Sequence, residues 1–259
     1  MASSLPLILL PPSEGKALGG TGAPWSAGAM AIDLDGERRR VITALTGAMR
    51  GGEPARAKLL GVTGSTLTAA TTDDRRITRS PTLPAIERYT GVLYDALDHR
   101  SLPAAQRKRL DASVVIVSGL WGAVMPADPV PAYRLKMSAA PPKLGKLSSF
   151  WRDPLTEALT GLARGRTIWN LLPKEHDAAW APDREQFVVR FLDRHADGSL
   201  FAVSHDNKSL KGAFVRFLLA HPGTQPADLA GWKHPAGYRY SARASTRDDA
   251  TTIVSMVRL

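Results

Sequence analysis

The first residues suited to chemistry lie in a short polar loop directly after an apolar segment. The sequence Pro11-Pro12-Ser13-Glu14-Gly15-Lys16 follows the run Leu5–Leu10, and its backbone amides together with the Lys16 amine could hold an anion. Its spacing differs from the GxxxxGK[ST] pattern of the nucleotide-binding P-loop. The pattern therefore allows two interpretations, an anion site that includes Ser13 and Lys16 or an ordinary surface loop.

A second group of candidate residues follows an apolar, β-branched segment near the middle of the chain. Ser118-Gly119-Leu120-Trp121-Gly122 comes first, and Tyr133 and Arg134 come soon after it. Glycine lets backbone approach a ligand closely, an aromatic ring can stack on a base, and a guanidinium holds phosphate with paired N–H groups. A tight turn with a core tryptophan and a structural arginine is the alternative. No G-x-S-x-G pattern surrounds Ser118, so the sequence does not support a hydrolase triad.

The composition excludes several kinds of chemistry. The 259 residues include no cysteine, which excludes disulfides and thiolate nucleophiles and favours a reducing compartment, the cytoplasm. The six histidines show neither HxH nor HExxH spacing, so we expect no metal site, and no motif indicates a cofactor. The apolar runs are too short to cross a bilayer, and Leu5–Leu10 has no basic residue before it, so we expect neither a membrane span nor a signal peptide.

The charge balance favours phosphate-rich partners. Lysine and arginine number 34 against 24 acidic residues, which gives a formal net charge of +10. A positive field of this kind attracts nucleic acid, nucleotides or anionic lipid. A proteome rich in arginine and alanine would produce the same excess without such a partner, so the placement of the cations must decide.

Three apolar segments are predicted to be the strands that position these residues. Leu5–Leu10, Val114–Val117 and Thr167–Leu172 are short and apolar, as in strands buried on both faces, and helical stretches separate them. This order predicts parallel pairing, and in such sheets ligands collect beyond the carboxyl ends of the strands. The residues at these three ends, Asn170 among them, should therefore converge.

The whole chain, residues 1–259, fits one α/β domain. Asp197-Gly198 separates two strand-like stretches, Phe187–Asp193 and Ser199–Ser204, and predicts a hairpin. We therefore expect a single compact mixed sheet with parallel core strands, an antiparallel C-terminal hairpin and flanking helices. Residues 34–110 form a candidate helical elaboration of this domain.

Hydrophobic periodicity predicts the helices. Leu34–Met49, Ala55–Leu60 and Leu83–Leu97 have helical spacing, and Gly91 interrupts the last of them. Another helix is expected over 208–220, with three cations outside its apolar stripe, namely Lys208, Lys211 and Arg216.

Two glycines separate two helical stretches within Leu59–Leu67, the sequence Leu-Leu-Gly-Val-Thr-Gly-Ser-Thr-Leu. A helix-hairpin-helix element that presents backbone N–H groups to DNA phosphates has this outline. An ordinary interhelical turn is the alternative, because glycines are common there.

In their order along the chain these segments resemble the YaaA family of peroxide-stress proteins, and the resemblance covers nearly the whole sequence. The matching residues are the first strand with the loop that ends in Lys16, Tyr89, Gly91, Tyr94, Ser118 to Gly122, Pro126, Asp128, Tyr133 to Met137, Phe150-Trp151, Asn170-Leu171, Glu175, Lys208, Lys211-Gly212, Arg216-Phe217 and Gly237-Tyr238.

The resemblance implies a mixed α/β fold with a positively charged cleft and a cytoplasmic location. It also implies a role in limiting iron-linked oxidative damage, and DNA binding attributed partly to a helix-hairpin-helix-like element, which would lie near 59–67. This chain departs from the family at four places. Its first loop is longer and carries Glu14, Lys136 stands where an acid is usual, His176 replaces an aromatic residue, and Lys211 replaces an arginine.

Three hypotheses follow. The leading one is a stress-response protein that binds duplex DNA through phosphate contacts from basic side chains. The second is an enzyme acting on a nucleotide or nucleoside, in which Tyr133 or Trp121 stacks a base and Lys16 or Glu175 is the catalytic group. The third is a regulatory or interaction protein with a structural cleft. The partner is thus duplex DNA or a nucleotide-like anion, no membrane is expected, and no feature sets the oligomeric state. The candidate binding residues are Ser13, Lys16, Ser118, Gly119, Trp121, Tyr133, Arg134, Asn170, Lys208, Lys211 and Arg216.

Overall fold

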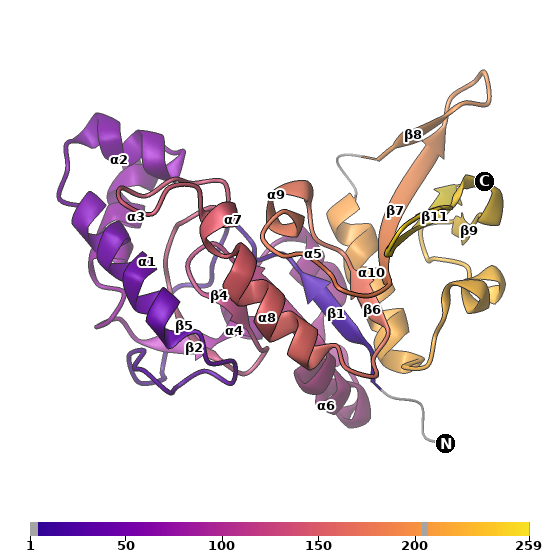
Figure 1. Cartoon of the computed structure of the whole chain (residues 1–259), viewed down its shortest axis with the longest axis horizontal. Helices are drawn as coiled ribbons and strands as arrows, with labels where there is room; N and C mark the ends of the chain where they lie inside the picture. Colours follow the sequence, from indigo (N-terminus) through magenta and orange to yellow (C-terminus); the bar gives the residue numbers. More distant parts are fainter. Residues whose placement is uncertain (1–4, 204–206, 259) are drawn as a thin grey trace.

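Strand β1 (Leu7–Leu10) lies inside a mixed sheet and pairs in parallel with β3 (Val114–Ser118) on one side and β6 (Ile168–Asn170) on the other. The computed structural model describes residues 5–203 and 207–258 (Figure 1). Every residue of these three strands is buried. The apolar, β-branched composition of the segments is what strands covered on both faces require. The predicted parallel core is confirmed.

The sheet continues on both sides of this core. Beyond β6 come β7 (Gln186–Arg194) and β11 (Thr251–Arg258), both in parallel register. Antiparallel strands complete it: β4 (Gly122–Val124) on β3, β8 (Leu200–Ala202) on β7, and β9 (Tyr238–Tyr240) and β10 (Thr246–Asp248) on β11. The hairpin predicted at Asp197-Gly198 joins β7 to β8, although Ser204, at the end of the predicted strand, lies outside the described residues.

The order of the strands creates a switch point at β1. The chain leaves β1 for β3 on one side and later returns across β1 to β6 on the other. Parallel crossovers are right-handed, so the helices of these two connections lie on opposite faces. Figure 1 shows α8 (Arg152–Leu162) in front of the sheet and α6 (Ala104–Ser113) behind it. A crevice opens at such a point beyond the carboxyl ends of the strands.

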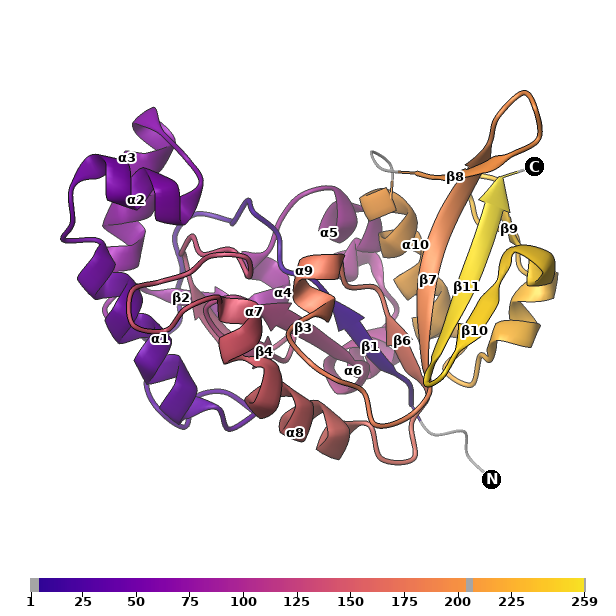
Figure 2. The same cartoon turned by 45° about the horizontal axis from the view of Figure 1, so that its top comes forward.

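Helices gather at one end of the molecule. Figures 1 and 2 show α1 (Asp35–Ala48), α2 (Glu53–Leu60) and α3 (Gly64–Arg75) together, away from the C-terminal strands. Helix α10 (Asn207–Ala220) packs closely on α5 (Val92–Leu97), because a Cβ on Gly212 would lie 2.3 Å from the Leu93 carbonyl oxygen. The remaining elements are β2 (Thr82–Pro84), β5 (Pro129–Pro131), α4 (Ala85–Arg88), α7 (Leu147–Phe150), α9 (Lys174–Asp177), η1 (His99–Ser101), η2 (Pro226–Gly231) and η3 (Ala242–Ala244).

The single helix predicted over Leu83–Leu97 was wrong. The structure divides this segment into the end of β2, α4 and α5, with Tyr89 to Gly91 extended between the two helices. Gly91 stands directly before α5 with a φ of 92°, a value that favours glycine and is incompatible with a continuous helix. Tyr89 forms an antiparallel bridge with Lys16, and the Thr90 N–H donates to Ser13 Oγ at 2.9 Å. Pairing with the loop after β1 therefore replaces the helical hydrogen bonds.

Within the described part of the chain, no helix combines the length and apolarity that a bilayer span requires.

Candidate anion site at the strand ends

A cavity of about 190 Å³ opens at the switch point, where the loops after β1 and β6 meet. The segment after β5 and the first turn of α10 complete its walls. The residues that line it are Pro11, Pro12, Ser13, Glu14, Lys16, Tyr133, Arg134, Leu135, Lys136, Pro173, Glu175, His176 and Lys208. A second cavity of about 220 Å³ shares the wall from Pro11 to Glu14 and Lys208. The structure thus brings together Ser13, Lys16, Tyr133, Arg134, Glu175 and Lys208, which the sequence places far apart.

Lys16 extends along the wall of this cavity over an aromatic ring. Its Nζ lies 4.2 Å from the centre of the Tyr133 ring and donates to the backbone oxygens of Ser13 at 3.0 Å and Glu14 at 3.4 Å. Burial lowers the pKa of Lys16 to about 8, although the nearby charge of Asp74 favours the ammonium form. The Lys16 amine therefore holds its proton less tightly than an exposed lysine does, and a part of it is neutral near neutral pH.

Asp74 is a buried acid at the inner side of the same site. It lies near the end of α3, and its Oδ1 accepts the Arg134 backbone N–H at 2.8 Å, while Oδ2 has no partner among the described residues. Burial raises the pKa of Asp74 to about 8. The sequence analysis missed this residue. The available signal was its position on the apolar stripe of the helix, three to four residues beyond Ala70 and Thr71.

Glu14 connects two cations at the mouth of the cavity. Its Oε2 lies 3.0 Å from Arg134 Nη2, and its Oε1 lies 3.4 Å from Lys136 Nζ. Partial burial raises the pKa of Glu14, but the charges of Lys136 and Arg134 outweigh that effect, so the net shift is downward. Glu14 is therefore ionised and partly neutralises the mouth. Arg134, Lys136 and Lys208 still leave an excess of positive charge around the cavity.

Ser118 supports the site from beneath. It is fully buried, and its Oγ lies 2.6 Å from the Tyr133 hydroxyl, which in turn lies 2.8 Å from the Tyr89 hydroxyl. The same Oγ accepts the backbone N–H groups of Leu120 and Trp121 at 3.2 Å. Burial raises the pKa of Tyr89 to about 12, so its hydroxyl stays protonated. This chain of hydrogen bonds fixes the ring on which the Lys16 amine rests.

Gly119 and Trp121 are also packed inside the protein. A Cβ on Gly119 would lie 2.8 Å from the Lys136 carbonyl carbon, so glycine is required there by the approach of another backbone segment. Trp121 is fully buried, with its ring centre 5.4 Å from that of Trp25 and 6.2 Å from that of Tyr133. The segment after β3 thus holds the Tyr133–Lys136 wall in place.

Three other candidate residues are occupied by contacts within the protein. Asn170 Nδ2 donates to Asp177 Oδ1 and Gln186 Oε1, each at 2.7 Å. Lys211 Nζ donates to the Leu171 carbonyl at 2.9 Å, and burial lowers the pKa of this lysine to about 8. Arg216 Nη1 donates to the Leu97 carbonyl at 2.8 Å. None of these three residues is in the described lining of either strand-end cavity.

His176 lies in the cavity wall as a neutral ring. Burial lowers its pKa to about 4, and its Nδ1 is 3.6 Å from Glu175 Oε1. Across residues 5–203 and 207–258 there is no group of three histidine or acidic side chains arranged to hold a metal ion.

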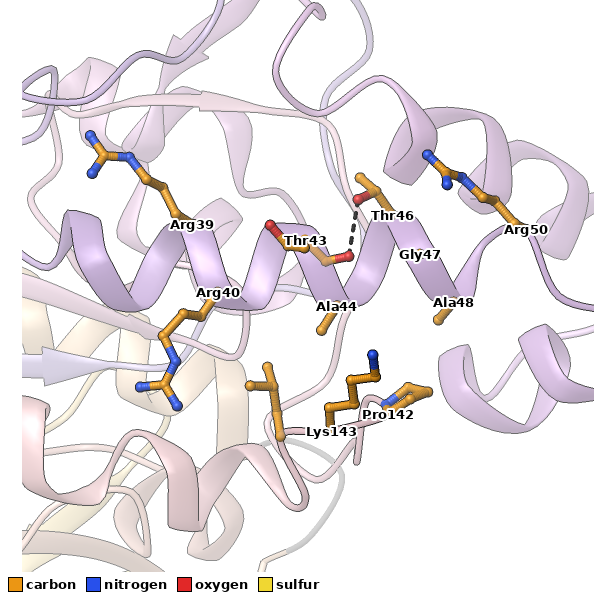
Figure 3. Close-up of a pocket in the computed structure, with 11 residues that line it drawn as sticks. Arg39, Arg40, Thr43, Ala44, Thr46, Gly47, Ala48, Arg50, Pro142 and Lys143 are labelled. Atoms are coloured by element: carbon orange, nitrogen blue, oxygen red, sulfur yellow. Dashed lines mark hydrogen bonds between the residues drawn. The ribbon is translucent and has the colours of Figure 1, made fainter.

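A larger, basic groove lies between α1 and the loop at 142–144. Its volume is about 740 Å³, and four cations line it: Arg39, Arg40, Arg50 and Lys143. Figure 3 shows Arg40 and Lys143 on the side of α1 that faces the loop, with Arg39 on the other side of the helix. Of the described residues in its lining, none is acidic. The sequence analysis did not identify this groove, because its two walls are about a hundred residues apart in the chain.

The two-glycine turn joins α2 to α3 beside the strand-end cavity. Gly61 and Gly64 are exposed and have φ values of 65° and 57°. A Cβ on Gly61 would lie 3.6 Å from Lys136 Nζ, so the turn adjoins the mouth of the cavity. The prediction of two helices around a glycine turn is confirmed. The turn, the cavity and the groove all lie on or beside the helical end of the molecule.

These features define the class of protein: a doubly wound α/β sheet with a cation-rich cavity at its switch point and with α1, α2 and α3 gathered at one end. A family model described as peroxide stress protein YaaA matches residues 7–244, and the chain belongs to that family. The resemblance noted from the motifs is thereby confirmed.

The relatives cover most of the chain. A UPF0246 protein of Streptomyces coelicolor is 39% identical over 249 residues, which are 93% of this chain and 94% of the relative. A UPF0246 protein of Corynebacterium glutamicum is 35% identical over 82% of this chain and 84% of its own length. One from Corynebacterium efficiens is 32% identical over 96% of this chain and 100% of its own length.

Proposed function

We propose that this peroxide stress protein binds duplex DNA through phosphate contacts in the cytoplasm and thereby limits iron-linked oxidative damage. The observation that carries the proposal is the exposed two-glycine turn at the start of α3, which lies beside the cationic side chain of Lys136. Its family supports the stress role.

The turn offers backbone N–H groups to an anion. Thr63, which precedes α3, makes no side-chain capping hydrogen bond, so the first N–H groups of this helix need another acceptor. The helix dipole adds a partial positive charge at the same place. Gly61 and Gly64 have no side chain that would keep a phosphate at a distance. A DNA phosphate fits these requirements.

The basic groove extends the positive surface along α1. Its four cations are exposed, and no acidic residue is present in the described lining. Figure 3 shows them along α1 and on the facing loop. Each phosphate that such a cation neutralises releases a counterion, which makes the affinity depend steeply on salt. Contacts of this kind bind any sequence, because they do not read base edges.

We place the protective effect at the DNA itself. Ferrous ions associate with the same phosphate oxygens that these cations would contact, because both carry positive charge. A protein bound along the duplex therefore competes with iron for the sites where peroxide is converted into damaging radicals.

The salt dependence of DNA binding tests the proposal. In a mobility-shift assay with a short duplex, the affinity should fall by more than tenfold between about 50 and about 200 mM salt. The triple variant Arg39→Ala, Arg40→Ala and Lys143→Ala should bind weakly and lower the salt slope by about 3. A control variant removes three exposed cations elsewhere, Arg100, Arg164 and Arg243, and should bind as wild type does. Equal affinity at both salt concentrations would reject the proposal.

An enzyme acting on a nucleotide or nucleoside is the second candidate, and one observation favours it. The strand-end cavity, at about 190 Å³, can hold a sugar phosphate or a single base but not a duplex, and it contains the Lys16 amine. Thermal stabilisation by mononucleotides but not by oligonucleotides would favour this candidate, since only a ligand bound to the folded state raises the melting temperature.

A further inference from the structure

We propose that the Lys16 amine forms a reversible imine with an aldehyde that carries a phosphate, the open-chain deoxyribose of an abasic site in DNA. This inference rests on the proposed function, because it uses DNA bound at the adjoining turn to deliver the aldehyde. It assigns to the strand-end cavity a covalent chemistry that phosphate binding alone does not require.

The position of the amine suits a nucleophile. Nζ is in the cavity wall, and the two backbone oxygens that it contacts, those of Ser13 and Glu14, match the two hydrogens of a neutral amine. The nitrogen lone pair then remains free for attack. An ordinary lysine is almost entirely protonated at neutral pH, whereas the pKa of about 8 at Lys16 leaves roughly a tenth of the amine neutral at pH 7.

The walls fix the amine in place. The Lys16 side chain lies on the Tyr133 ring, which the Ser118 and Tyr89 hydroxyls hold by hydrogen bonds of 2.6 and 2.8 Å. The backbone of Lys16 is bridged to Tyr89. A preorganised nucleophile of this kind loses little entropy when it reacts.

The surroundings select an aldehyde that also carries negative charge. Arg134, Lys136 and Lys208 line the same cavity and can hold a phosphate. The cavity volume of about 190 Å³ accommodates one sugar phosphate. Gly61 of the two-glycine turn adjoins Lys136, so a strand whose phosphate rests on the turn passes the mouth of the cavity.

The step balances without an added reagent. The lone pair of the neutral amine attacks the C1′ aldehyde carbon, and a proton moves from nitrogen to oxygen to give a carbinolamine. Loss of the hydroxyl group and the second nitrogen-bound proton as water leaves the C=N bond. Addition of water reverses the reaction. A hydride donor such as borohydride reduces the C=N bond and makes the link permanent.

Borohydride trapping tests the inference. The full-length protein is incubated with an abasic duplex, with free 2-deoxyribose 5-phosphate, or with a duplex that carries a tetrahydrofuran in place of the sugar and has no aldehyde. Each mixture is reduced, digested and mapped by mass spectrometry. We expect an adduct on Lys16 with the abasic duplex, formed faster as the pH rises from about 7 to about 8.

Matched variants make the result specific. Lys16→Arg keeps the positive charge but cannot form an imine, and Lys16→Met serves as a second variant if the first melts at a lower temperature. Lys108→Arg removes an exposed lysine from α6 as the control. Each Lys16 variant should give at least ten times less adduct than Lys108→Arg does.

The outcomes separate this inference from the proposed function. An unchanged adduct yield in Lys16→Arg, or an adduct mapped mainly to other lysines, overturns the inference. Duplex binding without any Lys16 adduct also overturns it but leaves DNA binding intact. An adduct with free 2-deoxyribose 5-phosphate in a protein that binds no duplex supports the imine chemistry and rejects DNA as its source.

Discussion

Glu14 and Lys136 face each other across the mouth of the strand-end cavity, with Oε1 3.4 Å from Nζ. The resemblance described in the sequence analysis marks both positions as departures from the family pattern. The two side chains neutralise each other, so together they leave the net charge around Arg134 unchanged, and we infer that the two departures compensate.

A charge exchange tests this relationship. Lys136→Glu alone places two acids together, so the pKa of Glu14 should rise and anion binding at the cavity should weaken about tenfold. The double variant Glu14→Lys with Lys136→Glu should regain most of the affinity for inorganic phosphate, measured by calorimetry. The stability should change by less than about 1 kcal/mol, because the pair is partly exposed. Additive losses in the double variant would contradict the compensation.

Asp74 should make stability depend on pH. Its pKa in the folded protein, about 8, lies above the value of an unfolded aspartate, so folding favours the protonated acid. The contribution of Asp74 to the free energy of unfolding is fully present below about pH 4 and is lost as the pH rises toward about 8. Asp74→Asn should therefore gain stability relative to wild type across that range in urea denaturation. A constant difference between the two proteins at all pH values would show that the pKa of Asp74 is the same in the folded and the unfolded protein.

Ser118 should act on stability rather than on binding. Ser118→Ala removes the acceptor of two buried N–H groups and the partner of the Tyr133 hydroxyl, which should cost about 1–3 kcal/mol. Duplex binding in the mobility-shift assay should stay within twofold of wild type. Ser138→Ala, at an exposed position, is the control and should leave stability unchanged. Loss of DNA binding without loss of stability would instead place Ser118 in contact with the ligand.

Gly64 should be required for both the turn and DNA binding. Alanine at a φ of 57° costs about 1 kcal/mol even where space is open, and its methyl group would also stand near the phosphate. Gly64→Ala should therefore lower the melting temperature slightly and weaken duplex binding at least fivefold. Gly36→Ala, in α1 with open space and an ordinary φ, is the matched control and should keep full affinity. Unchanged binding by Gly64→Ala would exclude the turn as a phosphate contact.

Protection of DNA should follow binding. In a plasmid nicking assay with ferrous iron and peroxide, wild-type protein should lower the nicking rate, and the triple variant of the basic groove should not. Raising the salt concentration should remove the protection in step with the binding, because both depend on the same phosphate contacts. Protection by a variant that no longer binds DNA would show that the protective effect does not depend on DNA binding.

The sequence predicted the parallel core because strands covered on both faces leave a strong local signal. The apolar runs around β1, β3 and β6 needed no tertiary information. The break at Tyr89 to Gly91 could not be predicted in the same way, because its cause is pairing with a loop about seventy residues earlier. Hydrophobic periodicity indicates only which face of a segment is apolar. In this segment α4 and α5 both bury their apolar faces, so the periodicity does not reveal the break between them.

The candidate site was predicted in part for the same physical reason. Lys16 follows β1, and the carboxyl ends of parallel strands meet at one edge of the sheet. Arg134 follows β5, which pairs with β2 outside that sheet, so the parallel pairing does not account for its position. Burial of individual polar groups depends on distant contacts, so the roles of Ser118, Asn170 and Asp74 were not visible. The net charge of the sequence was also a poor guide to the charge that the protein exposes on its surface. Arg38, for example, is fully buried and donates to the Trp121 and Ala123 carbonyls.

Helix α3 begins at the two-glycine turn and carries Asp74 near its other end. Ten residues of α-helix separate Gly64 from Asp74, which makes a stiff rod of about 15 Å. One rigid element therefore connects the surface turn, where we propose that a phosphate binds, with the carboxyl group whose charge acts on the pKa of Lys16.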